Sequence, residues 1–463
     1  MTSAEHNDPL HDWTARTDLL AHSLIGYAIE RVKLPKDTRW GPVEAATLDA
    51  ALDGAVCAPG IGGHAALRLF RDVLLPACRP MDDPLNLAYV PTAPSNAATM
   101  FDLVLSASSI FAGAWEAGAG AIAAENQALR WLADVAGMPE GAGGVFVSGG
   151  SAANLSALVT ARHVHRERTG SDARGTIAAT REVHASVRAA ARVMDCNVLP
   201  VDIDSTGRMT GAALAAALDA HHAADTGSDV FAVVATGGTT NSGTIDDLDG
   251  IADVCAARGL WLHVDGAYGL AALASPTART RFRGIDRADS FGVDPHKWLF
   301  APYDSAALVY RDPRPAAAAH AQHGDYLDAM DRGEWNPSDY AYHLSRRARG
   351  LPLWFSLATY GTDAYARAID TTIATTRAFA DSVKARPGFE LLLEPDLSVV
   401  LWTVDGWTRE RYLDWSRRRG REGRWLVVPT SWQGTPCLRI CVVHPRTDPA
   451  DLLTILDDLA TFT

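Results

Sequence analysis

The sequence contains no apolar run long enough to cross a membrane and no large basic region. No stretch of about 18 apolar residues occurs, and residues 1–12 are polar with mixed charge, so neither a transmembrane helix nor a secretory signal is expected. The net charge is −13, which the three arginines at 417–419 do not offset. Nucleic acids and anionic membranes are therefore poor partners, and we expect a cytoplasmic protein that acts on a small molecule.

Cysteine is scarce, and the common nucleotide-binding motifs are absent. The six cysteines form no CxxC pair, which argues against a zinc site or a disulfide framework, so we expect reduced thiols and no metal. Neither GxxxxGK[ST] nor a complete GxGxxG spacing occurs, which disfavours the nucleotide-binding folds. These cysteines are Cys57, Cys78, Cys196, Cys255, Cys437 and Cys441.

The hydrophobic pattern predicts an α/β protein in three parts. The 463 residues are 48% hydrophobic and 21% charged, enough for a large core. Residues 12–80 carry helical periodicity broken by Pro35, a turn at 59–63 and Pro76, which predicts an N-terminal helical segment over 1–81. Helix-like stretches follow at 97–105 and 121–136.

From residue 144 onward, short apolar runs alternate with segments of helix length. This alternation is typical of a largely parallel sheet, here in a large domain over 82–345. A long helix over 353–373 and several short strands then predict a small C-terminal α+β domain over 346–463. The apolar runs are 145–147, 176–179, 230–235, 260–264 and 306–310, and the later strands lie near 391, 398–402, 425–428 and 438–443.

Lys297 and Asp265 form the most informative pair. Lys297 follows a strand-like approach and lies between His296 and Trp298, while Asp265 ends the apolar run 260–264. An acid at the carboxyl end of a strand lies where α/β folds bind ligands. Pyridoxal phosphate needs both groups, a lysine amine for the Schiff base and a carboxylate for the pyridinium nitrogen. Taken alone, such a lysine is more often a surface residue, and such an acid can simply cap a turn.

Two glycine-rich loops and a histidine strengthen this interpretation. The run 148–151 (Ser-Gly-Gly-Ser) ends a strand and precedes a segment without Gly or Pro, so its glycines fall where a helix N-terminus can bind a phosphate. The loop 236–243 follows another strand and could approach the same place. His184 opens a helix between these loops, where an imidazole could stack on a pyridine ring. Each feature also has a plain structural explanation, as a tight turn or a polar surface residue.

These residues together resemble a known family. The ordered set 148–154, His184, 238–240, 263–268 and 294–298 is similar to the group II pyridoxal-phosphate-dependent amino acid decarboxylases, whose best-known members act on aromatic amino acids. The resemblance covers about residues 70–445. It implies the type I, aspartate-aminotransferase-like fold with a mostly parallel seven-stranded sheet, and a homodimer with active sites at its interface.

The resemblance also assigns roles to individual residues. Lys297 would hold the cofactor, Asp265 would pair with the pyridine nitrogen, and His184 would stack on the ring. The phosphate contacts would be Gly150, Ser151 and His296, and the substrate would be an L-amino acid. Thr240 would lie near another polar edge of the ring, and the substrate pocket would contain Tyr89, Val90, Pro91, Thr92 and, from the neighbouring subunit, Phe111.

The proton donor and the product are less determined. Family members use a tyrosine on a loop that crosses the dimer interface, for which Tyr340 is the first candidate and Tyr342 a reserve. Amine formation is expected because His184 and Tyr340 are both present, whereas aldehyde-forming members alter one of them. The alternatives are aminotransfer or decarboxylation-coupled oxidative deamination to an aldehyde, an acidic or diamino acid substrate, and a cofactor-binding protein without turnover. The last would predict loss of Lys297 or Asp265.

Three departures from the family pattern bear on specificity. Val90 stands where aromatic-specific members have a larger ring, and Gly113 replaces another aromatic residue, which leaves the substrate side chain open. Asp294 replaces a frequent asparagine near the phosphate end, a change that keeps the shape and alters the charge.

Overall fold

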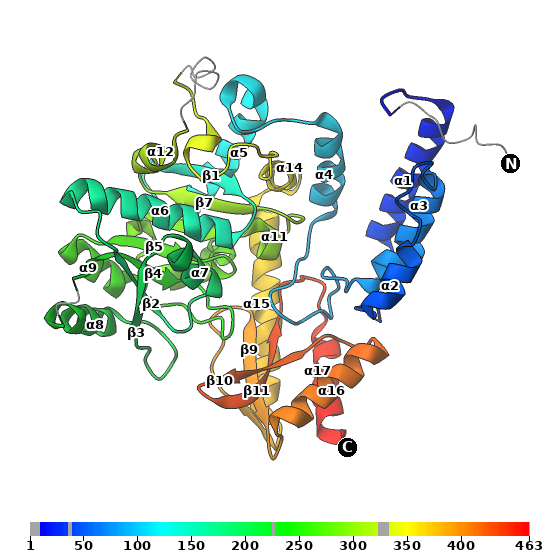
Figure 1. The fold of residues 1–463 in the computed structure, drawn as a ribbon. Helices are drawn as coiled ribbons and strands as arrows, with labels where there is room; N and C mark the ends of the chain where they lie inside the picture. The colour runs from blue at the N-terminus through cyan, green and yellow to red at the C-terminus, as the bar shows by residue number, and fades with distance from the viewer. Residues whose placement is uncertain (1–9, 36–38, 225–226, 323–332, 463) are drawn as a thin grey trace.

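The chain folds into a large α/β unit, a smaller C-terminal unit and a set of N-terminal helices at one side (Figure 1). The computed structural model describes residues 10–35, 39–224, 227–322 and 333–462. Among the described residues, no helix combines the length and apolar character needed to cross a membrane.

The large unit is built on a seven-stranded sheet of order β1-β7-β6-β5-β4-β2-β3. All pairings from β3 to β6 are parallel, and only β7 runs against its neighbours. The five predicted runs are confirmed as strands. The bounds are β1 Gly143–Val147, β2 Thr176–Thr180, β3 Asn197–Val201, β4 Val230–Thr236, β5 Trp261–Asp265, β6 Ser290–Val293 and β7 Ala306–Tyr310.

Of the two strands without a counterpart among these runs, β6 is the strand-like approach to Lys297, and β3 was missed. It contains Pro200, which cannot donate a hydrogen bond to a neighbouring strand, and proline weakens any strand prediction. The structure resolves the conflict by placing β3 at the edge of the sheet, where it pairs only with β2.

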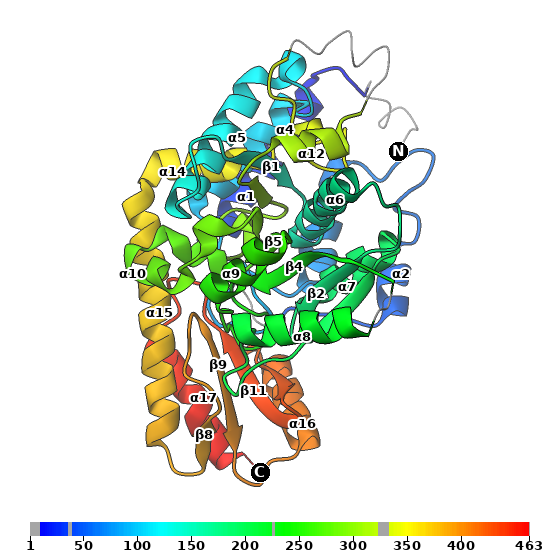
Figure 2. The ribbon, with the colours of Figure 1, turned by 90° about the vertical axis from the view of Figure 1, so that its left-hand side faces the viewer.

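Helices cover both faces of the large sheet, as Figures 1 and 2 show. Alternate residues of each central strand enter different cores: Val233 and Val264 face one side, while Ala232 and Val234 face the other. The first core packs against α5 Trp115–Val135, α8 Gly211–Ala223 and α9 Leu248–Arg258, and the second against α6 Gly150–Thr169 and α7 Ala185–Val193. The remaining helices of this unit are α4 Asn96–Ser108, α10 Pro276–Arg279, α11 Pro295–Trp298 and α12 Arg314–His320.

The C-terminal unit is a four-stranded antiparallel sheet of order β10-β11-β9-β8 with helices packed on it. The single helix predicted over 353–373 is wrong, because Gly361 at φ 75° and ψ 160° separates two helices. The strand predicted at 425–428 begins later, at Val428. The elements are α14 Leu351–Tyr360, α15 Thr362–Ala385, β8 Phe389–Leu391, β9 Val399–Val404, α16 Arg409–Glu422, β10 Val428–Trp432, β11 Thr435–Cys441 and α17 Pro449–Thr461.

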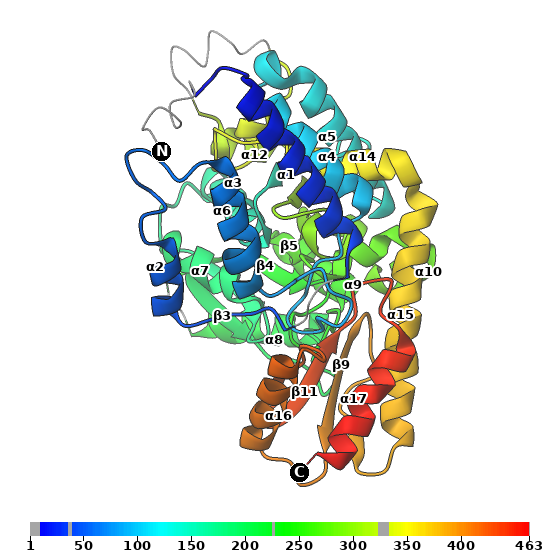
Figure 3. The same cartoon turned by 90° about the vertical axis from the view of Figure 1, so that its right-hand side faces the viewer.

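The N-terminal helices stand beside the rest of the molecule (Figures 1 and 3). They are α1 Ala15–Lys33, α2 Ala45–Leu52 and α3 Gly63–Leu69, which agrees with the predicted helical segment and its breaks. None of their residues is buried. The predicted limits of the three parts, at 81/82 and 345/346, stay predictions.

A buried ion pair joins α5 to the segment before α14. Arg346 donates from Nη1 and Nη2 to the two carboxylate oxygens of Glu125 at 2.7 and 2.8 Å, and both side chains are almost fully buried. Nη1 also donates to the carbonyl of Ala112 at 2.7 Å, and the Gly350 N–H donates to Glu125 at 2.8 Å. The pair therefore fixes the loop that contains Phe111 against the segment around 346–350.

We predict that Arg346→Met lowers the free energy of unfolding by about 3–5 kcal/mol, because Glu125 is left as an unpaired buried charge. Urea unfolding followed by circular dichroism measures the change. Arg418→Met is the matched control, since Arg418 forms an exposed pair with Asp414 and its loss should leave the urea midpoint unchanged. An equal shift in both variants would contradict the role of burial.

Candidate active site

Several strand ends meet at one edge of the large sheet. The parallel strands β2, β4, β5 and β6 end there, and so does β1, because it is antiparallel to β7, which is antiparallel to β6. Ligands of open α/β sheets bind at the carboxyl ends of the strands. The predicted site residues that directly end or follow these strands are Gly150, Ser151, His184, Thr240, Asp265, His296 and Lys297.

Lys297 lies on α11, the short helix that follows β6. Its Nζ is 2.8 Å from Oδ2 of Asp294. Burial by itself would lower the pKa of Lys297, but the charge and hydrogen bond of Asp294, together with the charge of Asp265, outweigh burial and raise this pKa above its ordinary value. The side chain is therefore an ammonium at neutral pH and must lose a proton before it attacks a carbonyl carbon.

Asp265 is the last residue of β5 and is 4% exposed. Its Oδ2 accepts a hydrogen bond from Nδ2 of Asn154 at 2.9 Å, and its Oδ1 accepts one from the N–H of Ala267 at 3.2 Å. These contacts hold the carboxylate in one orientation within electrostatic range of Lys297. A carboxylate fixed in this way can hold a proton on an opposing ring nitrogen.

His184 is connected to Asp265 through two side chains. It is the N-cap of α7, and its Nδ1 lies 3.3 Å from the N–H and 2.8 Å from the Oγ of Ser186. Ser186 Oγ in turn lies 2.9 Å from Nδ2 of Asn154. The amide of Asn154 thus contacts both Asp265, the predicted partner of the ring nitrogen, and Ser186, which holds the predicted stacking residue His184.

The direction of each hydrogen bond in this network follows from the charge of Asp265. An ionised carboxylate only accepts, so Asn154 must turn its NH₂ group toward it. One of these N–H groups goes to Asp265 and the other to Ser186, whose own hydroxyl proton is then donated to Nδ1 of His184. His184 therefore accepts hydrogen bonds at Nδ1 in this arrangement, which leaves Nε2 as the ring atom that can donate.

A second branch of the network runs from Asn154 to His263. The Asn154 Oδ1 lies 2.9 Å from Nε2 of His263, whose Nδ1 lies 2.8 Å from Oγ of Ser290. Trp261 donates to the same hydroxyl at 3.0 Å. Burial lowers the pKa of His263 to about 4, against the opposing charge of Asp265, so this ring stays neutral and acts as a fixed donor.

Sequence reasoning did not assign a role to Asn154, Ser186 or His263. Asn154 and His263 lie inside the motifs that carried the resemblance, and Ser186 lies two residues after His184. Nothing in the sequence indicates that the three side chains meet, because they belong to α6, α7 and β5.

The glycines before α6 leave room for an anion. Gly149 is the N-cap in extended backbone and supplies no side-chain cap, so the first N–H groups of the helix point to the site without a capping side chain. A Cβ atom on Gly150 would lie 3.0 Å from the Cβ of Ala267 and 3.3 Å from both carboxylate oxygens of Asp294. A side chain there would fill the space that a phosphate needs, while Ser151 is exposed at its rim.

His296 is buried beside this cradle. Its Nδ1 lies 2.6 Å from the carbonyl oxygen of Ser305, and its Nε2 lies 3.7 Å from Oδ2 of Asp294. Burial lowers the pKa of His296, an effect that the nearby charge of Asp294 only partly opposes. The ring is therefore neutral at physiological pH.

Arg439, which lies in the small sheet, binds the backbone of two predicted site loops. This almost fully buried residue of β11 donates to the carbonyls of Tyr89 at 2.5 Å, Thr240 at 2.6 Å and Asn241 at 3.0 Å. The side chain of Thr240 is exposed. The small unit thus positions the Tyr89 segment and the Thr240 loop relative to each other.

The predicted substrate segment begins at a backbone position that few residues adopt. Tyr89 has φ 57° and a 61% exposed side chain, while Val90 and Pro91 are buried. Thr92 is also buried, and its Oγ1 has no hydrogen-bond partner among the described residues. Thr92 and Tyr303 both line a cavity of about 270 Å³.

Gly113 has no space for an aromatic side chain. A Cβ atom there would lie 2.5 Å from the carbonyl oxygen of Leu344 and 2.6 Å from Cζ of Phe111. The ring of Phe111, which is 36% exposed, therefore takes the space that a side chain at Gly113 would need.

Tyr340 does not lie at the edge that carries Lys297 of its own chain. Its ring stacks on Trp335 at a centroid distance of 4.0 Å, and its carbonyl accepts a hydrogen bond from Tyr310 at 3.1 Å. Trp335 contacts Gly143, the first residue of β1, so this cluster lies at the end of β1 that is opposite to the candidate site. Burial raises the pKa of Tyr340 to about 12. The reserve candidate, Tyr342, is exposed.

Tyr303 is a site residue that the sequence analysis missed. Its ring lies 4.6 Å from that of His296, and it interacts electrostatically with Lys297. Burial raises its pKa, against the charge of Lys297. The only available signal was its position six residues after Lys297, which does not fix its orientation.

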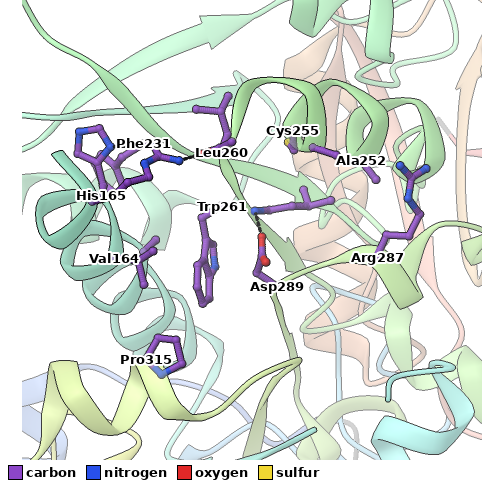
Figure 4. Close-up of a pocket in the computed structure, with 15 residues that line it drawn as sticks. Val164, His165, Phe231, Ala252, Cys255, Leu260, Trp261, Arg287, Asp289 and Pro315 are labelled. Atoms are coloured by element: carbon purple, nitrogen blue, oxygen red, sulfur yellow. Dashed lines mark hydrogen bonds between the residues drawn. The ribbon is translucent and has the colours of Figure 1, made fainter. Parts of the chain in front are cut away.

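A separate hollow of about 340 Å³ lies at the other end of the strands (Figure 4). It is lined by Phe231 and Trp261, which are at the amino ends of β4 and β5, and by Asp289, which precedes β6. Asp289 accepts a hydrogen bond from the N–H of Leu262 at 2.7 Å. No predicted site residue lines this hollow.

Residues 65–404 match the family model described as the pyridoxal-dependent decarboxylase conserved domain. The chain belongs to the pyridoxal-dependent decarboxylase family. It is 31% identical over 397 residues to the aromatic-L-amino-acid decarboxylase of Bacillus atrophaeus, covering 81% of this chain and 80% of that protein. It is also 31% identical over 411 residues to the L-2,4-diaminobutyrate decarboxylase of Rhizobium meliloti, covering 86% of this chain and 81% of the relative.

The fold agrees with this family. The crystal structure of Oryza sativa TDC with PLP and tryptamine superposes on the decarboxylase with a TM-score of 0.89 at 25% identity, covering 98% of each chain. The predicted type I fold, the enzyme class and pyridoxal phosphate as cofactor are thereby confirmed. The roles of individual site residues stay predictions.

The residues at the edge suit this cofactor chemically. They offer a lysine amine, a buried carboxylate on the neighbouring strand, and a glycine cradle at a helix N-terminus. Lys297 would hold the cofactor, Asp265 would face the ring nitrogen, and Gly150, Ser151 and His296 would contact the phosphate. When bound, the cofactor withdraws electrons from the α-carbon of the substrate.

We predict that Asn154→Leu lowers kcat/KM for carbon dioxide release roughly ten- to hundredfold. It leaves the buried Asp265 and Ser186 without their donor, at a cost of about 1–3 kcal/mol. The rate is measured with the best amino acid substrate, together with the pH profile of the bound-cofactor absorbance. Ser156→Ala on the same helix is the control, because Ser156 Oγ has no partner among the described residues, and equal losses would contradict the network.

Proposed function

We propose that the decarboxylase converts an L-amino acid to its amine and carbon dioxide at the edge formed by β1, β2, β4, β5 and β6. The observation that carries the proposal is that Lys297 and Asp265, at the ends of the adjacent strands β6 and β5, interact electrostatically, with His184 linked to Asp265 through Asn154 and Ser186. A protein that only bound the cofactor would not require this oriented set.

The proposed roles follow from the contacts. Lys297 loses a proton, holds the cofactor and exchanges with the substrate amine. Asp265 keeps a proton on the ring nitrogen, held in place by the Asn154 amide. His184 presents its Nε2 proton on the side away from Ser186. The Thr240 loop and the Tyr89 segment, both held by Arg439, orient the substrate.

The substrate class is proposed to be aromatic. Tyr89 and Phe111 would give the pocket two aromatic side chains, which contact rings well. Val90 makes the pocket wider than a larger ring at that position would. The alternative is an acidic or diamino acid.

The product is proposed to be the amine. His184 is held through its Nδ1 by Ser186, and Tyr340 is proposed to protonate the α-carbon in the site of a second subunit. Tyr303, which interacts with Lys297 of its own chain, is the second candidate for this proton. Decarboxylation coupled to oxidative deamination, which yields an aldehyde and peroxide, is the alternative that results if neither tyrosine delivers the proton.

We propose that the protein is a cytoplasmic homodimer. The N-terminal helices bury no residue, and Trp13, Leu19, Leu24, Ile25 and Ile29 are exposed on or beside α1. Apolar surface of this extent rarely stays in contact with water. A second copy of the chain is the proposed partner. All six cysteines are unpaired, as expected for reduced thiols.

We predict that one or more of the common L-amino acids releases amine and carbon dioxide in equal amounts from the wild-type enzyme. Lys297→Ala should bind no cofactor that borohydride can fix to the protein and should lose at least about a thousandfold in rate. A screen of the twenty amino acids with amine, carbon dioxide and peroxide detection measures this. Lys384→Ala, which changes an exposed lysine, is the control. Peroxide in place of amine would overturn the simple decarboxylation.

We predict that the dimer shares its active sites through Tyr340. Lys297→Ala and Tyr340→Phe should each be inactive for amine formation, but equal co-expression should restore about a quarter of the wild-type activity, because half of the dimers are mixed and each has one intact site. Sedimentation confirms that the dimer is present. No recovery, or a fully active Tyr340→Phe, would refute this and favour Tyr303.

A further inference from the structure

The buried carboxyl group of Asp294 has one oxygen without a hydrogen-bond partner. Asp294 is 2% exposed and directly follows β6. Its Oδ2 lies 2.8 Å from Nζ of Lys297 and 3.7 Å from Nε2 of His296. Its Oδ1 has no partner among the described residues. Buried carboxylate oxygens are rarely left unpaired, so this atom indicates a contact that forms only when the site is filled.

The free oxygen faces the place where the phosphate is proposed to bind. Both carboxylate oxygens of Asp294 would lie 3.3 Å from a Cβ atom on Gly150, the first residue of α6. A helix N-terminus stabilises one anion well. Here the carboxylate of Asp294 and the phosphate of the cofactor would compete for the same helix end at short range.

Cofactor binding also removes the cation that now pairs with Asp294. The ammonium of Lys297 would first give one proton to Asp294, 2.8 Å away. The amine would then form a carbon–nitrogen double bond with the cofactor aldehyde, and its two remaining hydrogens would leave with the aldehyde oxygen as water, with no change in oxidation state. Nζ then no longer offers three N–H donors to Asp294. At the same time the phosphate brings up to two negative charges to the cradle. Two like-charged groups in one buried place cannot both stay ionised without a large cost.

We propose that, when the cofactor is bound, Asp294 carries the proton that the Lys297 ammonium gives up and donates it in a hydrogen bond from its free oxygen to the phosphate. The proposal rests on the proposed use of this edge as the cofactor site. The shape of the residue stays that of the asparagine common in the family, while its hydrogen-bonding role depends on pH.

The other titratable groups around Asp294 are poor alternatives for this proton. On its own segment, burial lowers the pKa of His296 and raises that of Tyr303, so the first resists protonation and the second is already neutral. Lys297 is consumed by the cofactor. From β5 the nearest acid is Asp265, which already accepts two hydrogen bonds. The first turn of α6, residues 150–153, is Gly-Ser-Ala-Ala and has no side chain that titrates in this pH range.

The test is the dissociation constant of pyridoxal phosphate between pH 6.5 and 9, by absorbance, for wild type and Asp294→Asn. Above pH 7 the free phosphate is already a dianion, so its own second ionisation adds little. Wild type keeps the Lys297 proton on Asp294, whereas Asp294→Asn must release it to solution. Rising pH should therefore weaken cofactor binding by wild type up to about tenfold per pH unit relative to Asp294→Asn. Taking the ratio of the two proteins cancels the proton changes of the cofactor itself.

Asp289→Asn is the matched control, because Asp289 precedes the same strand at its other end. The ratio of its dissociation constant for pyridoxal phosphate to that of wild type should stay constant over this pH range. Asp294→Ala gives a second variant that lacks the carboxyl group, and it should follow Asp294→Asn in its pH dependence. His296→Gln should keep the pH dependence of wild type.

Each result decides the proposal. The role of Asp294 would be overturned, with the proposed cofactor site left intact, by either of two results. One is a ratio of dissociation constants between wild type and Asp294→Asn that does not change with pH, and the other is a pH dependence that disappears in His296→Gln. Failure of the wild type to bind the cofactor at any pH would overturn it together with the proposed site. Because no amino acid is present, absence of decarboxylation leaves this measurement unaffected.

Discussion

The hydrogen bond from Asn154 to Asp265 is the contact on which the geometry of the site depends. It joins α6, which begins at the glycine cradle, to the end of β5. The same amide group reaches Ser186, which supports His184 at the start of α7. The buried side chain of Asn154 thus connects the start of α6, where the phosphate is proposed to bind, with Asp265 and His184. Its orientation is set by the negative charge of Asp265.

The side chains at this edge carry more negative than positive charge. Two carboxylates, Asp265 and Asp294, surround the single ammonium of Lys297. Buried charges are tolerated when they are paired and hydrogen-bonded, and Asp294 is paired through only one of its oxygens. A group that uses the lysine amine and adds negative charge would increase this excess, which is the reason that a proton on Asp294 is proposed.

The two folded units complete the site together. Arg439 of the small sheet holds the Tyr89 segment and the Thr240 loop through their carbonyls. Tyr268, which follows β5, stacks on Trp298 at 5.3 Å and accepts a hydrogen bond from the N–H of Ser398 at 2.8 Å. Movement of the small unit would therefore reach both the substrate segment and the residue next to Lys297.

The sequence determined the fold class, the order of most strands and the residues at their ends. Strands buried on both faces read as apolar runs, and the residues that follow them, such as Asp265 and Lys297, can be identified from position alone. β3 was lost because Pro200 weakens its pattern, and the break at Gly361 was missed because the apolar period continues across it.

Only the tertiary structure decided how these residues act on one another. Asn154, Ser186 and His263 lie on three different elements, so their meeting depends on how α6 and α7 pack on the sheet. The ring of Tyr340 lies on Trp335 at the far edge, while Tyr303 lies beside His296. Sequence spacing fixes which strand end a residue follows, but contacts between side chains from different elements are set by packing, which no local pattern encodes.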